Sequence, residues 1–221
     1  MVAQLQMLKD VVVVHLGVGM APALVTKFMV ELGAQVTRVE PPGGDPFAAV
    51  YPAYEVWLRG SALDADAAAS PARLDALLAA ADVCLVGGED YPGVARRWNA
   101  AELSARFPRL VVLDIEAAPA GTEHAQRPAT ELLVQARSGL TFEHFSDRPM
   151  VMSFSPANFG AALRGLAGLF AALYEREGSG QGQVVATSLF EGAAVWAGAA
   201  GAKSKSRPRT PGSSFRRTQS R

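Results

Sequence analysis

Strand-like and helix-like patterns of apolar residues alternate along most of the chain. The segments 11–16, 35–40, 83–86, 110–115 and 184–187 are short and apolar or alternating, which is typical of strands. Apolar residues at helical spacing predict helices that begin at Pro22 and Pro71, helices over 95–107 and 131–138, and a helix from Asn158 to a stop at Gly178.

This order of elements predicts the fold class. A strand–helix–strand unit has a right-handed crossover, so its two strands lie parallel in one sheet. Repetition of the unit predicts an α/β protein with a Rossmann-like, doubly wound, mainly parallel sheet and flanking helices. Ligands bind such sheets at the carboxyl ends of the strands, so we expect functional residues in the loops there.

The helix from Asn158 has the most regular pattern. Phe159, Leu163, Leu166, Phe170 and Leu173 follow at alternating spacings of four and three, which predicts that they share one face of the helix. Asn158 itself can act as an N-cap that accepts backbone N–H bonds. A polar side chain at a helix N-terminus also lies where developing negative charge is favoured, so a functional role stays open beside the capping role.

Charge is distributed unevenly along the 221 residues. The formal net charge is zero, but residues 203–221 hold seven of the 21 basic residues and no acidic one, which leaves 14 basic against 21 acidic residues before them. We therefore expect one globular unit over 1–197 and a disordered basic tail over 198–221. The tail could bind nucleic acid or anionic lipid or be a flexible terminus, but its abrupt start favours a shifted reading frame.

Composition excludes several classes of protein. The balanced net charge argues against a protein that binds nucleic acid as its main function, and no apolar run is long enough to span a membrane. The single cysteine, Cys84, lies in an apolar strand and is expected to be a buried structural thiol. Without a signal peptide, the sequence predicts a cytoplasmic protein.

The residues alone reveal no complete catalytic motif. The three histidines have no metal-ligand spacing, so no metal site is predicted; His15 is expected in the core, and His124 and His144 on surface loops. Gly17 and Gly19 begin a dinucleotide-like loop, but Pro22 stands where its third glycine should be. Neither a P-loop nor a G-x-S-x-G nucleophile turn is present.

Six stretches in register resemble the family III CoA-transferases, the group of formyl-CoA and carnitine-CoA transferases and α-methylacyl-CoA racemase. The longest, LGAQVTRVEPPGGDP over 32–46, resembles the LGAxVxKVEPPGGDP of the family. The others are SALD (61–64), ADV (81–83), FPRL (107–110), QARSGL (135–140), and AALYER (171–176) followed by SGQGQVV (179–185). From the order and spacing of these stretches, the resemblance covers residues 11 to about 197.

The resemblance implies an incomplete large domain of such an enzyme, since the family's chains are substantially longer and interlock as homodimers. It implies CoA and acyl-CoA as substrates, together with a small carboxylic acid. In the family an aspartate attacks the thioester to form a mixed anhydride and then an aspartyl-CoA thioester. That position falls on Asn158, whose carboxamide cannot form the anhydride. Glu131 matches an acidic position near the active site, with a helix-surface glutamate as the alternative.

The resemblance also suggests residues that contact CoA. Val18, Gly19 and Met20 follow the first strand and are suggested as CoA contacts, since the A-G-P turn of the family corresponds here to Met20-Ala21-Pro22. Pro92 and Gly93 remain from the E-N-F-x-P-G motif of the family. Three arginines stand where basic residues of the family meet CoA phosphates, although each could equally be a solvated surface residue. These are Arg38, Arg59 and Arg97.

Three functional hypotheses follow. The first is a divergent CoA-transferase that moves CoA between carboxylic acids through an enzyme-bound thioester. The second is a non-catalytic CoA-binding or subunit-interaction paralogue, because Asn158 replaces the nucleophile. The third is a pseudogene product.

The resemblance does not extend to the racemase reaction. In the racemase branch a histidine precedes the acidic position, and Thr130 stands there instead, so racemase activity is not expected.

Overall fold

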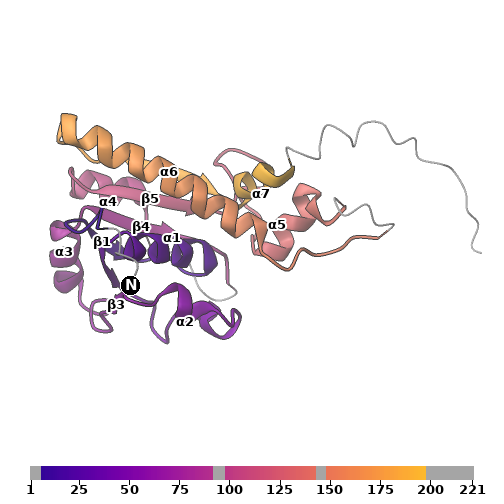
Figure 1. Ribbon diagram of the computed structural model, residues 1–221, viewed down its shortest axis with the longest axis horizontal. Helices are drawn as coiled ribbons and strands as arrows, with labels where there is room; N and C mark the ends of the chain where they lie inside the picture. Colours follow the sequence, from indigo (N-terminus) through magenta and orange to yellow (C-terminus); the bar gives the residue numbers. More distant parts are fainter. Residues whose placement is uncertain (1–5, 92–97, 143–147, 198–221) are drawn as a thin grey trace, which may run out of the picture.

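The computed structural model describes residues 6–91, 98–142 and 148–197. Its strands form one parallel six-stranded sheet in the order β3-β2-β1-β4-β5-β6, with helices on both faces (Figure 1). This confirms the predicted doubly wound α/β fold. The strands are β1 (Val12–His15), β2 (Gln35–Arg38), β3 (Ala62–Leu63), β4 (Val83–Gly87), β5 (Val111–Glu116) and β6 (Val184–Ser188).

The connecting helices include one that is much longer than the rest. They are α1 (Met20–Glu31), α2 (Tyr54–Trp57), α3 (Pro71–Ala80), α4 (Ala100–Arg106), α5 (Glu131–Ser138), α6 (Pro156–Ser179) and α7 (Leu189–Ala197), with 3-10 turns η1 (Pro46–Ala49) and η2 (Leu140–Phe142). Within the described residues, no helix combines the length and the apolar character that crossing a membrane requires.

The sheet reverses its winding between β1 and β4, which are neighbours in the sheet. The loops that follow these strands lie against each other, with Val18 N donating to Gly87 O at 2.9 Å. Gly88 has φ +117°, and a Cβ there would stand 1.9 Å from Val18 O, so only glycine fits. The two loops are thus joined at the crevice where doubly wound folds bind ligands.

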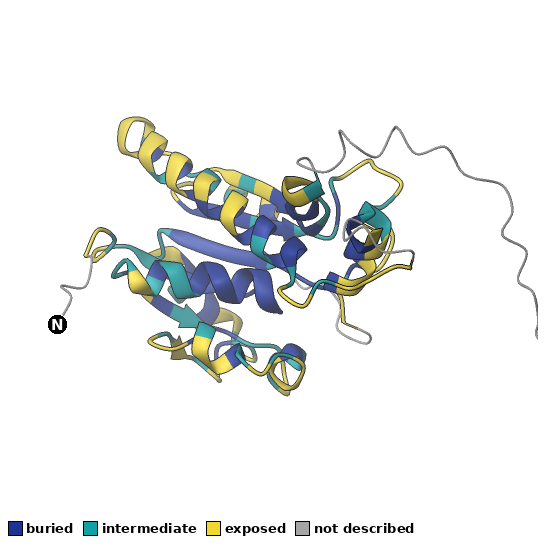
Figure 2. Cartoon of the chain, turned by 45° about the vertical axis from the view of Figure 1, so that its right-hand side comes forward, coloured by how far each residue is buried: buried dark blue, intermediate teal, exposed yellow. Residues whose placement is uncertain are grey.

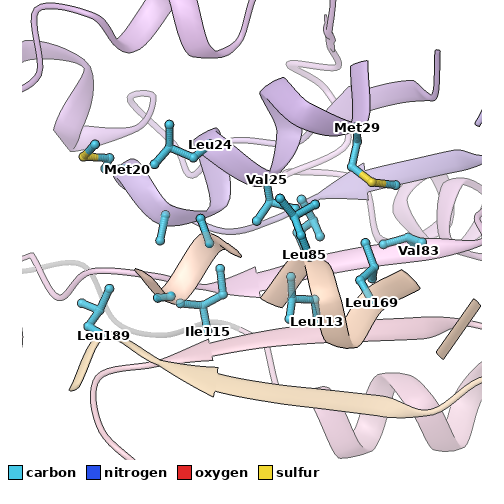
Figure 3. Packing of buried hydrophobic residues seen from close by; sticks show 14 of the residues in the cluster. Met20, Leu24, Val25, Met29, Val83, Leu85, Leu113, Ile115, Leu169 and Leu189 are labelled. Carbon is cyan, nitrogen blue, oxygen red and sulfur yellow. The ribbon is translucent and has the colours of Figure 1, made fainter. Parts of the chain in front are cut away.

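Each face of the sheet carries its own apolar core, because successive strand residues point to opposite sides. Val13, Leu85 and Leu113 belong to the core under α1, α6 and α7. Side chains from these helices and from the sheet meet in Figure 3. The opposite core contains Val14, Cys84 and other strand residues packed against α3 and α4.

The apolar face predicted for α6 is buried only in part. Leu166 is buried but Leu163 and Phe170 are exposed, while Ala161, Gly165 and Ala172 are among the residues turned inward. These small residues let α6 approach the sheet closely: a Cβ on Gly165 would lie 3.0 Å from Leu113 Cδ2. The exposed outer side of α6 is visible in Figure 2.

Several predicted boundaries were also wrong. The long helix begins at Pro156, before Asn158, and continues past Gly178 to Ser179, where Gly180 with φ +72° is its C-cap. The helix expected from 95 begins at Ala100, because the side chain of Asn99 caps it. Residues 92–97 and 198–221 lie outside the described residues, so the disordered tail stays a prediction.

Candidate functional site

The start of α1 is a meeting point of four segments. Backbone N–H groups at a helix N-terminus have no acceptor within the helix, and three successive ones here donate to side chains from elsewhere. The acceptors come from the loop after β2, the loop after β4 and the first turn of α6. Gly19 N donates to Asp45 Oδ2 (2.9 Å), Met20 N to Glu89 Oε2 (3.3 Å), and Ala21 N to Asn158 Oδ1 (3.0 Å).

These contacts bear on the segment Val18–Met20, which the resemblance suggested as a CoA contact. A phosphate at a helix N-terminus is bound by backbone N–H groups. Here the amide of Val18 is bonded to Gly87, and those of Gly19 and Met20 to carboxylates. The CoA contact of this segment stays a prediction, and it would have to use carbonyl groups or side chains.

Glu131 is buried, so the alternative of a helix-surface glutamate is wrong. Its carboxylate accepts four hydrogen bonds, two at each oxygen, from the start of α6 and from its own helix. Oε1 accepts from Ala157 N (3.1 Å) and Gln135 Nε2 (2.8 Å), and Oε2 accepts from Asn158 N (2.9 Å) and Asn158 Nδ2 (2.8 Å). The structure therefore brings the two residues suggested as catalytic, Glu131 and Asn158, into direct contact.

Asn158 does not cap α6, contrary to expectation. The N-cap is Ser155, in a left-handed conformation with φ +56°, and its side chain makes no capping bond. Glu131 instead accepts the N–H groups of Ala157 and Asn158, which an N-cap side chain would otherwise take. The Asn158 side chain is left to bridge α1 and α5, and the residue is 0% exposed.

Glu89 belongs to the site although the sequence did not suggest it. It is buried, accepts from Tyr51 Oη at 2.8 Å and from Glu131 N at 3.0 Å, and also bonds Met20 N. Burial raises the pKa of Glu89 above its ordinary value, while its hydrogen bonds act in the opposite direction. Its position directly after β4, at the sheet reversal, was the feature that could have identified it.

The other suggested residues lie apart from this cluster or outside the described residues. Arg38, on β2, donates from Nε to Ser61 Oγ at 3.0 Å and is ion-paired with Glu40. Arg59 is exposed after α2. Pro92, Gly93 and Arg97 lie outside the described residues.

A cleft of about 750 Å³ opens at the carboxyl ends of β4 and β5, and neither Glu131 nor Asn158 is among the residues that line it. Its polar lining includes Glu116 from the end of β5, Asp90 from the loop after β4, and Arg127. Thr130, directly before Glu131, also lines it. The cleft thus lies at the edge of the sheet where the fold class predicts a ligand.

The remaining candidate side chains have structural surroundings. His15 is in the core as predicted, with Nδ1 2.9 Å from Thr26 Oγ1, and burial lowers its pKa to about 3. Burial raises the pKa of the Cys84 thiol, so it remains protonated. His124 is only partly on the surface, because its ring stacks on Phe190 with centroids 4.5 Å apart. His144 lies outside the described residues.

Among solved structures, the chain resembles hypothetical protein Rv3272 from Mycobacterium tuberculosis, with 25% identity and a TM-score of 0.73. The match covers 95% of this chain and 61% of that one. The fold is also shared with a CAIB/BAIF family protein from Brucella suis, at 21% identity and a TM-score of 0.67, over 86% of this chain and 57% of that one.

Two characterised relatives are similar in sequence. Succinyl-CoA–D-citramalate CoA-transferase from Chloroflexus aurantiacus is 28% identical over 202 residues, which are 84% of this chain and 50% of that protein. CoA-transferase/lyase DddD from Marinomonas is 30% identical over 195 residues, 81% of this chain and 23% of that protein. The chain therefore spans half the length of the first relative and less than a quarter of the second.

The model of CoA-transferase family III matches residues 8–220. Because this match runs over nearly the whole sequence, the chain belongs to CoA-transferase family III.

Proposed function

We propose that this chain recognises CoA thioesters at the carboxyl edge of its sheet, as part of a CoA-transferase that moves CoA from an acyl-CoA to a small carboxylic acid. Family membership supports this reaction class. The observation that supports a particular site is that Thr130 lines the cleft while Glu131, the next residue, is in direct contact with Asn158. A second copy of the chain as partner and a cytoplasmic location are further parts of the proposal.

The covalent step that the resemblance implies needs a carboxylate at position 158. That carboxylate attacks the thioester carbonyl, and CoA leaves as thiolate. The thiolate then attacks the enzyme carbonyl of the resulting anhydride, and the acyl group leaves as a free carboxylate. The nitrogen lone pair of Asn158 is delocalised into its amide, and the amide oxygen is bonded to Ala21 N. Asn158 therefore supplies no nucleophile for this sequence of steps.

A second candidate function is CoA binding without an enzyme-bound thioester. The specific observation in its favour is that Asn158 is 0% exposed and has both polar ends of its amide engaged. In this case the protein would hold an acyl-CoA as a binding subunit or regulator. The two candidates share the cleft and differ in whether a covalent adduct forms.

Calorimetric titration of CoA into the full chain tests the shared part of the proposal. We expect binding that is weakened about tenfold by Arg127→Ala, because the cleft would lose a charged contact to the CoA phosphates. Arg164→Ala is the matched control, since Arg164 lies on α6 and pairs with Glu191 instead. Absence of CoA binding, or equal weakening by both substitutions, would contradict the proposed site.

Trapping with hydroxylamine separates the two candidates. The protein is incubated with acetyl-CoA or succinyl-CoA, treated with hydroxylamine, digested, and analysed by mass spectrometry for a hydroxamate. Binding without any adduct favours the non-catalytic candidate. An adduct on a carboxylate of the unaltered chain favours transfer and identifies the nucleophile.

A further inference from the structure

Both polar ends of the Asn158 amide are hydrogen-bonded, the nitrogen to Glu131 and the oxygen to Ala21. Ala21 N can only donate, so the Asn158 oxygen must face α1; the Glu131 carboxylate can only accept, so the Asn158 nitrogen must face α5. Neither end of the amide can be exchanged for the other. The site therefore requires one acceptor and one donor on the side chain of residue 158.

The surroundings of this pair are acidic. Facing it are Glu89 from the loop after β4, with Tyr51 bonded to it, and Asp45 from the loop after β2. Within the described part of the chain, no ion pair joins Asp45, Glu89 or Glu131 to a lysine or arginine. On α7, Glu191 is paired with Arg164, farther along α6. None of these side chains carries a positive charge that would offset a second negative charge at residue 158.

An aspartate at 158 would keep the bond to Ala21 through one oxygen. Its other oxygen would replace Asn158 Nδ2, which is 2.8 Å from Glu131 Oε2. Two carboxylate oxygens at this distance cannot both stay ionised, and such pairs retain one proton between them.

We infer that residues 131 and 158 form a pair that accepts a single negative charge: Asn158 is its neutral member, and an aspartate there is tolerated only with a proton shared with Glu131. This inference rests on the proposed function and adds to it, because an aspartate at position 158 would have to lose the shared proton before it could act as a nucleophile. The proton belongs to the pair rather than to either residue.

Thermal unfolding of the full chain between pH 5 and 8, without CoA, tests the inference. In Asn158→Asp the folded state holds a proton that the unfolded state releases, so its stability falls as pH rises through this range. We expect its Tm to fall by about 5 °C more than that of the unaltered chain. The double variant Asn158→Asp with Glu131→Gln again has one carboxylate and one amide, so the extra fall should disappear.

Asn99→Asp is the matched control. Asn99 also lies at a helix N-terminus, but its Oδ1 accepts from Ala101 N and Glu102 N, a role that an aspartate performs equally well. We expect no additional pH dependence in this variant. The inference is overturned if Asn158→Asp follows the same pH profile as Asn99→Asp, or if the double variant keeps the steeper profile.

Failure of a variant to fold is also informative. Asn158→Asp that folds at pH 5 but not at pH 8 supports the shared proton, whereas a variant unfolded at both values overturns it. Because these measurements contain no CoA, they can succeed while the CoA titration fails. The inference and the proposed function therefore fail independently.

Discussion

The N-termini of α1 and α6 meet at the same site but are stabilised differently. Around the start of α1, three N–H groups are each bonded to a different side chain, from three segments of the chain. At the start of α6, two N–H groups are bonded to the single carboxylate of Glu131. Loss of one acceptor should therefore leave α1 mostly supported, whereas α6 depends on one residue.

Glu131→Ala should have the largest effect on stability, because the N-terminus of α6 depends on this one residue. It leaves the N–H groups of Ala157 and Asn158 and the side-chain amide of Asn158 without the Glu131 acceptor. Gln135 Nε2 keeps its second bond, to Met152 O. Since buried unsatisfied donors are costly, we expect a loss of about 3 kcal/mol in the free energy of unfolding, measured with urea. Glu177→Ala, on the exposed end of α6, should cost less than about 0.5 kcal/mol. Equal losses would contradict the role of Glu131.

Asn158→Ala should have the next largest effect, because it removes the residue that joins the two helix ends. Ala21 N loses its acceptor, while Glu131 loses one donor of four. We expect a loss of about 2 kcal/mol. A loss as large as that of Glu131→Ala would mean that α1 depends on a single acceptor too.

Glu89→Gln should reduce the pH dependence of the stability, in addition to removing one acceptor, because the amide nitrogen would face the N–H group of Met20 or of Glu131. Because burial raises the pKa of Glu89, the folded state binds a proton more tightly than the unfolded state. Glu89 therefore makes the protein less stable as pH rises through the interval between its ordinary and its raised pKa. In Glu89→Gln the change of Tm between pH 5 and pH 8 should be smaller than in the unaltered chain. An unchanged difference would show that Glu89 does not contribute.

Ser155→Gly should produce the smallest effect, and in the opposite direction. Ser155 is the one non-glycine residue with positive φ in the described part of the chain, and its side chain caps nothing. Glycine adopts this conformation without strain, so we expect a gain of about 0.5 kcal/mol. Ser70→Gly should instead lose about 0.3 kcal/mol, because Ser70 Oγ accepts from Arg73 N at the start of α3. Urea unfolding of both variants compares them.

Five of the six strands of the sheet were predictable because they are local apolar or alternating runs, whereas the two-residue, exposed β3 gives no such pattern and was missed. Segments such as Val83–Gly87 are buried on both faces, so every residue contributes to the pattern. The buried face of α6 was not predictable in the same way. Its large apolar residues Leu163 and Phe170 dominate the periodicity, but close packing against the sheet selects the small residues instead.

The site was predictable only in part. The resemblance indicated Glu131 and Asn158, but their burial and their mutual contact depend on segments far apart in the sequence. Glu89 was missed because its role arises from contacts with Tyr51, Met20 and Glu131, none of which is a sequence neighbour. Its location after β4 was informative once the sheet order was known.

The bond from Ala21 N to Asn158 Oδ1 joins residues separated by 137 positions. During synthesis the amide of Ala21 leaves the ribosome long before its acceptor exists, so the contact can form only after α6 has been made. Contacts between such distant residues form late, and they open only when much of the structure opens. The hydrogen-exchange rate of this one amide should therefore report whether the complete fold has assembled.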